Sequence, residues 1–328
     1  MSKLGLICSV YNDTKYLRKL WGTIENISVK DMKFYFIDDF STNEIISELE
    51  DVVKDSSKDV EIISMPIETR GFGAGAARNY VLDKIDDEYV GFVDADDLVS
   101  PTYHEKLIEL ADVYQLDCIK TGWTIVSYAN RTTAKLEDVI PINTPLPGEA
   151  YFKPYNKSNL YDKPHSWAGL YRKTFLDDNN IRFSNLFTAE DRLFWTKCLC
   201  VSSRLMATHI YDGYLYRKEN DIRLTSTGNR IQNEFFKAGE EIINYVSTQG
   251  ISADAWRKII TQQIALIDFH YKNRSRLSTV ALYDMHFKAS RLMAILKHCP
   301  EFDFVYSNLS SARKDLIQKL ESKEYVML

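Results

Sequence analysis

The residues with the clearest capacity for chemistry are the acids of the tetrapeptide Asp94-Ala95-Asp96-Asp97. They follow the apolar run Tyr89-Val90-Gly91-Phe92-Val93, which has the composition of a buried strand. Side chains two positions apart in extended backbone point to the same side, so Asp94 and Asp96 are expected to face one space. Two such carboxylates repel each other unless a cation or hydrogen-bond donors lie between them. An isolated pair with this spacing more often belongs to a polar turn, but its position at a strand end favours a site for Mg²⁺ or Mn²⁺ that leaves places for phosphate oxygens.

A second acidic pair, Asp38-Asp39, ends the apolar run Lys33-Phe34-Tyr35-Phe36-Ile37. A carboxylate at this position could accept the imide N–H of a uracil base. The alternative is a helix cap, which the following Ser41 and Thr42 would also support.

The segment Gly71-Phe72-Gly73-Ala74-Gly75-Ala76-Ala77-Arg78-Asn79 is rich in glycine, which lets backbone approach a ligand closely. Arg78 adds a planar fork of donors. The segment also fits loosely the G-x-G-x-x-[GA] pattern of dinucleotide-binding dehydrogenases. In that pattern the first glycine directly follows its strand, whereas residues 66–70 intervene here. A dehydrogenase that binds NAD and needs no metal is kept as an alternative.

The last chemical candidate is Ala189-Glu190-Asp191, at the start of the amphipathic stretch that continues through Trp195. Acids in the first turn of a helix commonly offset the helix dipole. A carboxylate there could equally act as a general base directed into a cleft, and the two interpretations are compatible.

Strands that alternate with helices are expected to position these residues. Apolar runs predict strands at 4–10, 33–37, 60–65 and 89–93. Helices are predicted over about 15–26, through 45–53, after the glycine-rich turn and from Ser100-Pro101 onward. This order predicts an α/β fold with a mostly parallel, Rossmann-type sheet, and ligands bind such sheets at the carboxyl ends of the strands.

The chain after residue 230 is predicted to be helical only, with apolar stripes at helical spacing. Residues 1–229 hold 27 Lys and Arg against 35 Asp and Glu, whereas residues 230–328 hold 14 against 11. This change of sign and the turn-like run Thr225–Asn229 predict two domains, 1–229 and 230–328.

The bulk composition excludes several classes of protein. The net charge of −5 disfavours binding to nucleic acid. The five cysteines are odd in number and lie mostly in apolar runs, so we expect core thiols in a reducing, cytoplasmic environment. We also expect no signal peptide and no membrane span.

Taken together, these segments resemble the family 2 glycosyltransferases with the GT-A fold, over roughly residues 4–227. The resemblance lies in the order and spacing of five segments: Val10-Tyr11-Asn12, Ile37-Asp38-Asp39-Phe40-Ser41, Gly75-Ala76-Ala77-Arg78-Asn79, Asp94-Ala95-Asp96-Asp97 and Ala189-Glu190-Asp191. Ser9 stands where the family usually has proline, Phe40 where a small or polar residue is common, and Gly169 where a basic residue is often found.

The resemblance implies a role for each matching residue. Tyr11 and Asp39 would hold the base, with Arg78 nearby on the nucleotide. Asp94 would lie near the ribose or the donor sugar, and Asp96 would ligate a metal that bridges the two phosphates.

The same resemblance implies an inverting transfer. Asp191 would be the catalytic base that takes the proton from an acceptor hydroxyl, and Glu190 would orient Asp191 or the acceptor. A divalent cation can stabilise the departing nucleoside diphosphate, so no protonating acid is required.

Further candidates fall where relatives place a strand and a mobile loop. Arg217 and Arg223 could close on the diphosphate. His209 could be an additional metal ligand, with a buried structural histidine as the alternative. Trp167 and the aromatic residues before it could offer stacking faces to sugars or could pin a loop to the domain.

The expected partners are a UDP-sugar donor and a glycan or bacterial surface-polymer acceptor, such as teichoic acid, capsule or lipopolysaccharide. A catalytically silent glycan-binding or assembly subunit on the same fold is the rival of another class. Residues 268–298 carry six Lys and Arg against two Asp and Glu, which raises the hypothesis of a peripheral contact with an anionic membrane or polymer. The C-terminal helices could also form a homo-oligomer contact.

Overall fold

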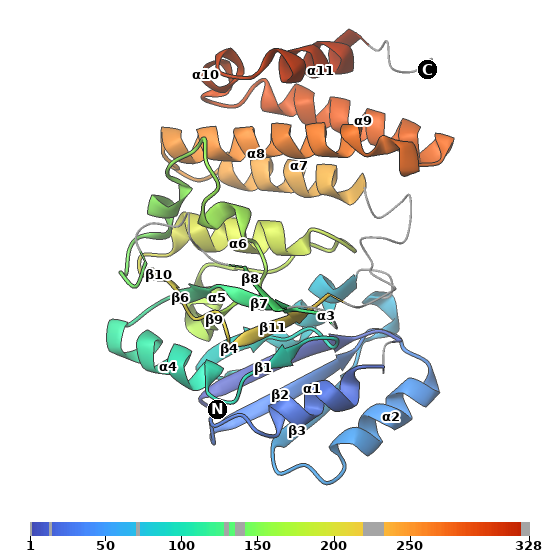
Figure 1. Ribbon diagram of the computed structural model, residues 1–328, viewed down its shortest axis with the longest axis vertical. Coiled ribbons are helices and arrows are strands. Elements are labelled where there is room, and N and C mark those ends of the chain that lie inside the picture. Colours follow the sequence, from blue (N-terminus) through green and yellow to red (C-terminus); the bar gives the residue numbers. More distant parts are fainter. Residues whose placement is uncertain are drawn as a thin grey trace.

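The computed structural model describes residues 2–12, 15–69, 73–127, 131–134, 142–218 and 233–322 (Figure 1). Within these ranges the strands are β1 (Leu4–Val10), β2 (Met32–Asp38), β3 (Asp59–Ser64), β4 (Tyr89–Phe92), β5 (Leu98–Val99), β6 (Cys118–Thr121), β7 (Trp123–Val126), β8 (Arg131–Ala134), β9 (Gly169–Arg172), β10 (Leu205–Thr208) and β11 (Tyr214–Arg217). The α-helices are α1 (Leu17–Ile24), α2 (Asn43–Val53), α3 (Gly73–Leu82), α4 (Tyr103–Tyr114), α5 (Lys173–Asp178), α6 (Glu190–Val201), α7 (Glu234–Val246), α8 (Ala253–Lys272), α9 (Thr279–Leu296), α10 (Phe302–Ser307) and α11 (Ser311–Ser322). Short 3₁₀ turns are η1 (Ile67–Thr69), η2 (Gly148–Phe152), η3 (Leu160–Asp162) and η6 (Arg274–Arg276).

The main sheet has seven strands in the order β10-β6-β9-β4-β1-β2-β3. Its β1, β2, β3 and β4 are parallel to one another, as are β6 and β10. Strand β9 runs antiparallel to both of its neighbours. The predicted α/β class and mostly parallel sheet are therefore confirmed.

The strand order places a topological switch point between β1 and β4. Strands β2 and β3 follow β1 on one side, whereas β4 pairs with β1 on the other side. Ligands of open α/β sheets bind in the crevice beyond such a point. The acids that follow β2 and β4 lie at the carboxyl ends of strands on the two sides of β1, so the fold brings two of the predicted segments to one edge.

A second, four-stranded sheet has the order β5-β11-β7-β8. Strand β5 directly follows Asp94–Asp97, and it pairs antiparallel with β11 through Val99 and Tyr214. This small sheet therefore holds Tyr214 next to the acidic tetrapeptide.

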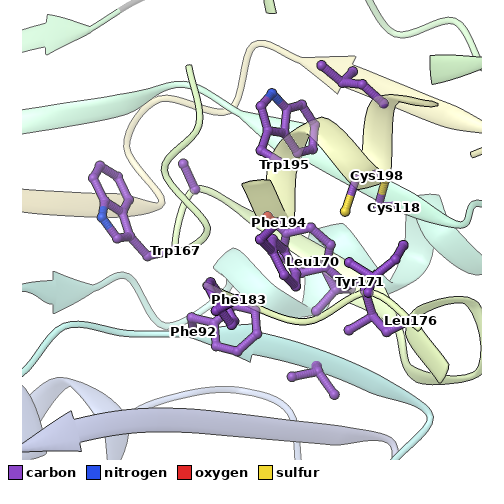
Figure 2. Packing of buried hydrophobic residues seen from close by; sticks show 14 of the residues in the cluster. Phe92, Cys118, Trp167, Leu170, Tyr171, Leu176, Phe183, Phe194, Trp195 and Cys198 are labelled. Atoms are coloured by element: carbon purple, nitrogen blue, oxygen red, sulfur yellow. The ribbon is translucent and has the colours of Figure 1, made fainter. Parts of the chain in front are cut away.

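An aromatic cluster fills the core between β4, β9 and α6 (Figure 2). Phe183 stacks on Phe194 with ring centroids 4.2 Å apart, and Phe92 meets Phe183 edge-on at 5.1 Å. Tyr171 of β9 packs on Phe194 at 5.1 Å. Such pairs stabilise the core by about 0.5–1.5 kcal/mol each beyond the apolar area that they bury.

Two predicted helix starts differ from the structure. Helix α4 begins at Tyr103 with Thr102 as its N-cap, whereas the sequence predicted Pro101 as the first helical residue. Helix α1 has Tyr16 as N-cap and begins at Leu17. The predicted capping residues Asp13 and Thr14 lie outside the described residues.

The described part of the chain after residue 232 is helical, as predicted, and α7 to α11 stack in layers away from the sheet (Figure 1). Helix α7 packs on α6, and α8 packs on η2. Both predicted stripes are buried: one comprises Trp256, Ile260, Ile264, Ile267 and Tyr271, and the other Met285, Ala289, Leu292 and Leu296. The proposed domain boundary at 229/230 falls in a range that the structure does not describe, so it stays a prediction.

The basic surface predicted over 268–298 carries acids beside its bases. Lys272 pairs with Asp268, Lys288 with Asp284 and Arg291 with Glu240. Contact with a membrane or with a second copy of the chain stays a prediction. No helix within the described residues has the length and apolar character needed to cross a membrane. All five cysteines are free thiols; Cys198 is buried and Cys200 half-buried, consistent with core packing.

Candidate active site

Arg78 is the centre of the candidate site. Its Nη2 lies 2.8 Å from Oδ1 of Asp94, and its Nη1 lies 3.2 Å from Oε1 of Glu190 and 3.5 Å from Oδ1 of Asp191. The Arg78 side chain is 4% exposed, whereas Asp94 is 30% exposed and the two α6 acids are each 15% exposed. One guanidinium thus gathers three predicted functional carboxylates from two segments that lie almost a hundred residues apart.

The guanidinium rests on the aromatic core. Its central carbon lies 5.3 Å from the ring centroid of Phe183 and 6.0 Å from that of Phe92. Burial by itself would lower the pKa of Arg78, but the negative charges of Asp94, Asp191 and Glu190 raise it above its usual range. The rings of Phe92 and Phe183 and the three acids therefore keep Arg78 charged and fixed in place.

Helix α3 reaches α6 closely because of its glycines. A Cβ at Gly75 would lie 2.6 Å from the carbonyl oxygen of Ser184 and 3.0 Å from Cβ and Cγ of Glu190. Gly73 adopts a left-handed φ of 72°, which glycine adopts without strain. The glycine-rich segment therefore serves close helix packing in this chain, and Gly71 and Phe72 lie outside the described residues.

The first turn of α6 presents Glu190 and Asp191. Its N-cap, Ala189, has a left-handed φ of 65°, which is uncommon for alanine and turns the chain sharply into the helix. The backbone N–H of Ser166 donates to Oδ2 of Asp191 at 3.2 Å. Asp191 is therefore held from two sides, by Ser166 and by Arg78.

Burial and mutual repulsion perturb the acids of this cluster. Burial, followed by the negative charge of Asp191, raises the pKa of Glu190 to about 8 against the opposing effect of Arg78. Burial also raises the pKa of Asp94 to about 6, with Arg78 opposing and Asp96 adding to the increase. Acids with raised pKa values that converge in one place are typical of functional sites.

Asp97 points away from the other acids, toward β11. It is fully buried, and its carboxylate accepts hydrogen bonds from the Tyr214 hydroxyl at 2.8 Å and from the Arg217 backbone N–H at 2.7 Å. The same Tyr214 hydroxyl accepts from the backbone N–H of Asp94 at 3.1 Å. Asp97 and Tyr214 thus fix the backbone that carries Asp94 and Asp96, a role that sequence reasoning did not assign.

The donor set of this strand end fits a divalent cation. Asp94 and Asp96 follow the same strand and are both half-buried. Magnesium and manganese sites that act on nucleotides often use one or two carboxylates and complete their shell with phosphate oxygens and water. No group of three or more His, Cys, Asp or Glu side chains in the described part of the chain could hold a metal ion by itself, and the predicted metal site stays a prediction.

The two loops after β1 and β2 are tied together at the neighbouring edge. Asn12 donates its backbone N–H to Oγ of Ser41 at 3.0 Å, and its side-chain oxygen accepts from the backbone N–H of Thr42 at 3.0 Å. Tyr11 is 59% exposed, which leaves its ring free to meet a ligand. Burial, and then the charge of Asp38, raises the pKa of Asp39 to about 6.

Asp38 and Phe40 explain the local turn after β2. Asp38 accepts the backbone N–H of Ser41 at 3.0 Å, which closes the turn, whereas α2 has Thr42 as N-cap and no capping side chain, so neither acid caps the helix. Phe40 has a left-handed φ of 66°. That conformation favours glycine, which gives the physical reason why a bulky residue is unusual at this position.

The weaker candidates make no ion pair with the acids that Arg78 gathers, within the part of the chain that the structure describes. His209 is exposed beyond β10, against the ring of Tyr211 at 5.2 Å, so its interpretation as a buried histidine is wrong. Arg217 is buried with its guanidinium 4.2 Å from the ring centroid of Tyr16, and Arg223 lies outside the described residues. Trp167 is buried and stacks on Tyr214 at 4.4 Å, which supports the interpretation as a hydrophobic pin.

Residues 6–177 match the family model described as glycosyl transferase family 2, which is just over half of the chain. This range includes Tyr11, Asp39, Arg78, Asp94 and Asp96 and ends before α6.

Similar proteins include the poly(ribitol-phosphate) beta-N-acetylglucosaminyltransferase TarS of Staphylococcus aureus (strain MW2), at 23% identity over 77% of this chain and 41% of TarS. Another is the glycosyltransferase GlyA of Streptococcus pneumoniae serotype 4, at 35% identity over 35% of this chain and 16% of GlyA. The chain therefore spans less than half the length of these curated relatives.

The fold matches the crystal structure of S. aureus TarS 1–349 in complex with UDP-GlcNAc, with a TM-score of 0.74 and 18% identity over 98% of this chain and 88% of that chain. A mannosyltransferase from Pyrobaculum calidifontis, in complex with GDP-Man and Mn²⁺, matches with a TM-score of 0.53 and 11% identity over 98% of this chain and 84% of that chain. These likenesses confirm the predicted GT-A fold. The family match leaves the dehydrogenase alternative without support, and the chain belongs to glycosyl transferase family 2.

Proposed function

We propose that this chain is an inverting glycosyltransferase that moves a sugar from a UDP-linked donor to a hydroxyl group of a cell-surface polymer. The observation that carries the proposal is the Arg78 cluster, which places Asp94 of the strand end within reach of the same guanidinium as Asp191 of α6. The proposed donor site and the proposed base then lie on either side of Arg78.

The donor nucleotide would lie over the carboxyl ends of β1, β2 and β4. Tyr11 is exposed there and Asp39 is half-buried, so one can stack on a base while the other accepts a hydrogen bond from it. TarS was crystallised with UDP-GlcNAc, which makes this donor the first to test. A polymer with free hydroxyl groups, as in a teichoic acid, would be the acceptor.

Asp94 and Asp96 would hold a Mg²⁺ or Mn²⁺ ion together with the diphosphate. When bound, the ion supplies positive charge next to the leaving group. The Asp97–Tyr214 contact contributes by holding the metal-binding backbone in one conformation.

Asp191 would act as general base. The acceptor oxygen attacks the anomeric carbon, the bond from that carbon to the diphosphate oxygen breaks, and the acceptor proton passes to Asp191. The attack comes from the face opposite the nucleotide, so a single displacement inverts the anomeric configuration. Ser166 and Arg78 would hold the Asp191 carboxylate in position for this transfer.

The test combines donor binding with turnover. Calorimetry of UDP and UDP-GlcNAc, with and without Mn²⁺, should show metal-dependent binding that Asp96→Ala weakens by at least about tenfold, or about 1.4 kcal/mol. Asp191→Asn should keep donor binding and lower kcat by about 10²–10⁴-fold, whereas the exposed Asp178→Asn should change neither. The anomeric configuration of the product, read by NMR, tests inversion.

Other outcomes separate the rivals. Donor binding without turnover for any polymer acceptor would support the silent glycan-binding subunit. Wild-type turnover in Asp191→Asn would overturn the assignment of the base, and a retained anomeric configuration would overturn the single displacement.

A further inference from the structure

Lys120 of β6 is a fully buried lysine. Its Nζ donates to the backbone carbonyl oxygen of His165 and lies 4.6 Å from the ring centroid of Trp195 on α6, whose place in the core Figure 2 shows. Among the described residues no carboxylate lies within ion-pair distance of Nζ. A buried ammonium group without a directly paired acid is costly, and an apolar side chain of similar length would usually fill the same space at lower cost.

The hydrogen bond from Lys120 leads directly to Asp191. Its acceptor is the C=O of the peptide group between His165 and Ser166, and the N–H of the same peptide group donates to Asp191 Oδ2 at 3.2 Å. Hydrogen bonds that share a peptide group polarise one another, so a charge on Lys120 strengthens the donor that Ser166 offers.

The charges of Lys120 and Asp191 also interact through space. Burial lowers the pKa of Lys120 to about 7, and the negative charge of Asp191 opposes this decrease. Gly169 is the cross-strand partner of Lys120 on β9, and a Cβ there would lie 2.4 Å from the carbonyl oxygen of Ile119. Other titratable groups interact electrostatically with each member of this pair. Those around Lys120 are His165, Cys118 and Cys198. Those around Asp191 are Arg78, Glu190, Asp94, Arg192 and Tyr171.

We propose that Lys120 is a positioning residue for Asp191, which it orients through the His165–Ser166 peptide group and through its positive charge. The inference rests on the proposed function of Asp191 as the base. Arg78 shares its single charge among three acids, and Lys120 supplies a second positive charge that reaches Asp191 through the His165–Ser166 peptide group.

The test measures kcat and KM for UDP-GlcNAc across a range of pH in Lys120→Met. The variant keeps the length of the side chain and removes the charge, so the Ser166 N–H becomes a weaker donor to the Asp191 carboxylate. The acidic limb of kcat should move to higher pH by roughly 1 unit, the usual scale of a nearby charge. The KM for the donor should stay at the wild-type value, and the melting temperature should not fall.

Lys258→Met is the matched control. Lys258 is also buried and donates to a backbone carbonyl oxygen, that of Lys157, at 2.7 Å, but it pairs with Asp162 and makes no hydrogen bond to the His165–Ser166 peptide group. The Lys258→Met variant should therefore show the wild-type pH dependence of kcat. Lys120→Gln, which retains a hydrogen-bond donor without charge, repeats the test if Lys120→Met does not fold.

An unchanged acidic limb in the folded Lys120 variants, with Asp191→Asn inactive, would overturn this inference and leave the proposed function intact. Wild-type turnover in Asp191→Asn would overturn both.

Discussion

Glu190 shows how one residue can carry both the electrostatics and the stability of the site. It shares Arg78 with Asp191 and Asp94, and its side chain is only 15% exposed. Three acids and one cation leave an excess of negative charge, which a bound cation, a bound proton or both must offset. The raised pKa of Glu190 indicates that a proton does so at neutral pH.

We predict that Glu190→Gln changes how stability depends on pH. The pKa of Glu190 is raised from 4.5 to about 8 in the folded chain, so the folded state keeps a proton that the unfolded chain releases. Its contribution is therefore fully present below pH 4.5 and is lost as the pH rises through about 8. Relative to wild type, the melting temperature of Glu190→Gln should improve steadily from about pH 5 to about pH 8.

Thermal unfolding at a series of pH values, in the presence of EDTA, checks this prediction. Glu50→Gln is the control, because Glu50 is exposed and lies on α2. A constant difference between Glu190→Gln and wild type at every pH would show that Glu190 is ionised in the folded state.

At the scale of elements, the position of the acids depends on how closely α3 approaches α6. Gly75 makes this approach possible, since its neighbours leave no room for a Cβ. Arg78 lies one turn further along α3 and reaches back to Glu190 and Asp191. The spacing of the two helices therefore sets the geometry of the cluster.

Gly75→Ala should both destabilise the chain and disrupt the site. The new Cβ would meet the Ser184 carbonyl oxygen at 2.6 Å, so α3 must shift, at a cost of about 1–3 kcal/mol. Denaturant titration measures that cost, and kcat should fall with it. Gly22→Ala on α1 is the control: nothing lies within 4 Å of its Cβ, so the helix should gain about 0.5–1 kcal/mol. A neutral Gly75→Ala would mean that the helix spacing tolerates a methyl group.

The sequence predicted the strands that carry the acids because their apolar runs end abruptly in aspartates, as at Val93-Asp94 and Ile37-Asp38. The antiparallel strand β9 was not predicted, since Gly169-Leu170-Tyr171-Arg172 has only two apolar side chains between a glycine and an arginine. The roles of Lys120 and Tyr214 could not be predicted from the sequence for another reason. Each acts on an acid that is distant in the chain, and only the packed sheet order reveals the pairing.

On the scale of the whole molecule, the C-terminal helices contact α6 directly. Helix α7 packs on α6, and its first residue, Glu234, accepts the backbone N–H groups of Phe187 at 2.6 Å and Thr188 at 3.0 Å. These two residues immediately precede Ala189 and the acids of α6. The C-terminal region thus fixes the backbone that leads into α6, the helix that carries Asp191. The two parts of the chain are therefore in contact, whichever residue separates them.

Glu234→Ala should therefore lower activity although Glu234 lies on a different part of the chain from the donor site. Losing its carboxylate frees the segment before α6 and lets Asp191 drift, and a displacement of about 1 Å can cost up to about 10²-fold in kcat. Donor binding, measured by calorimetry, should stay unchanged, because β1, β2 and β4 do not depend on this contact. Glu241→Ala, also on α7, is the matched control and should keep wild-type kcat. A wild-type kcat in Glu234→Ala would instead mean that Arg78 and Ser166 suffice to hold Asp191, and that the C-terminal helices serve another purpose.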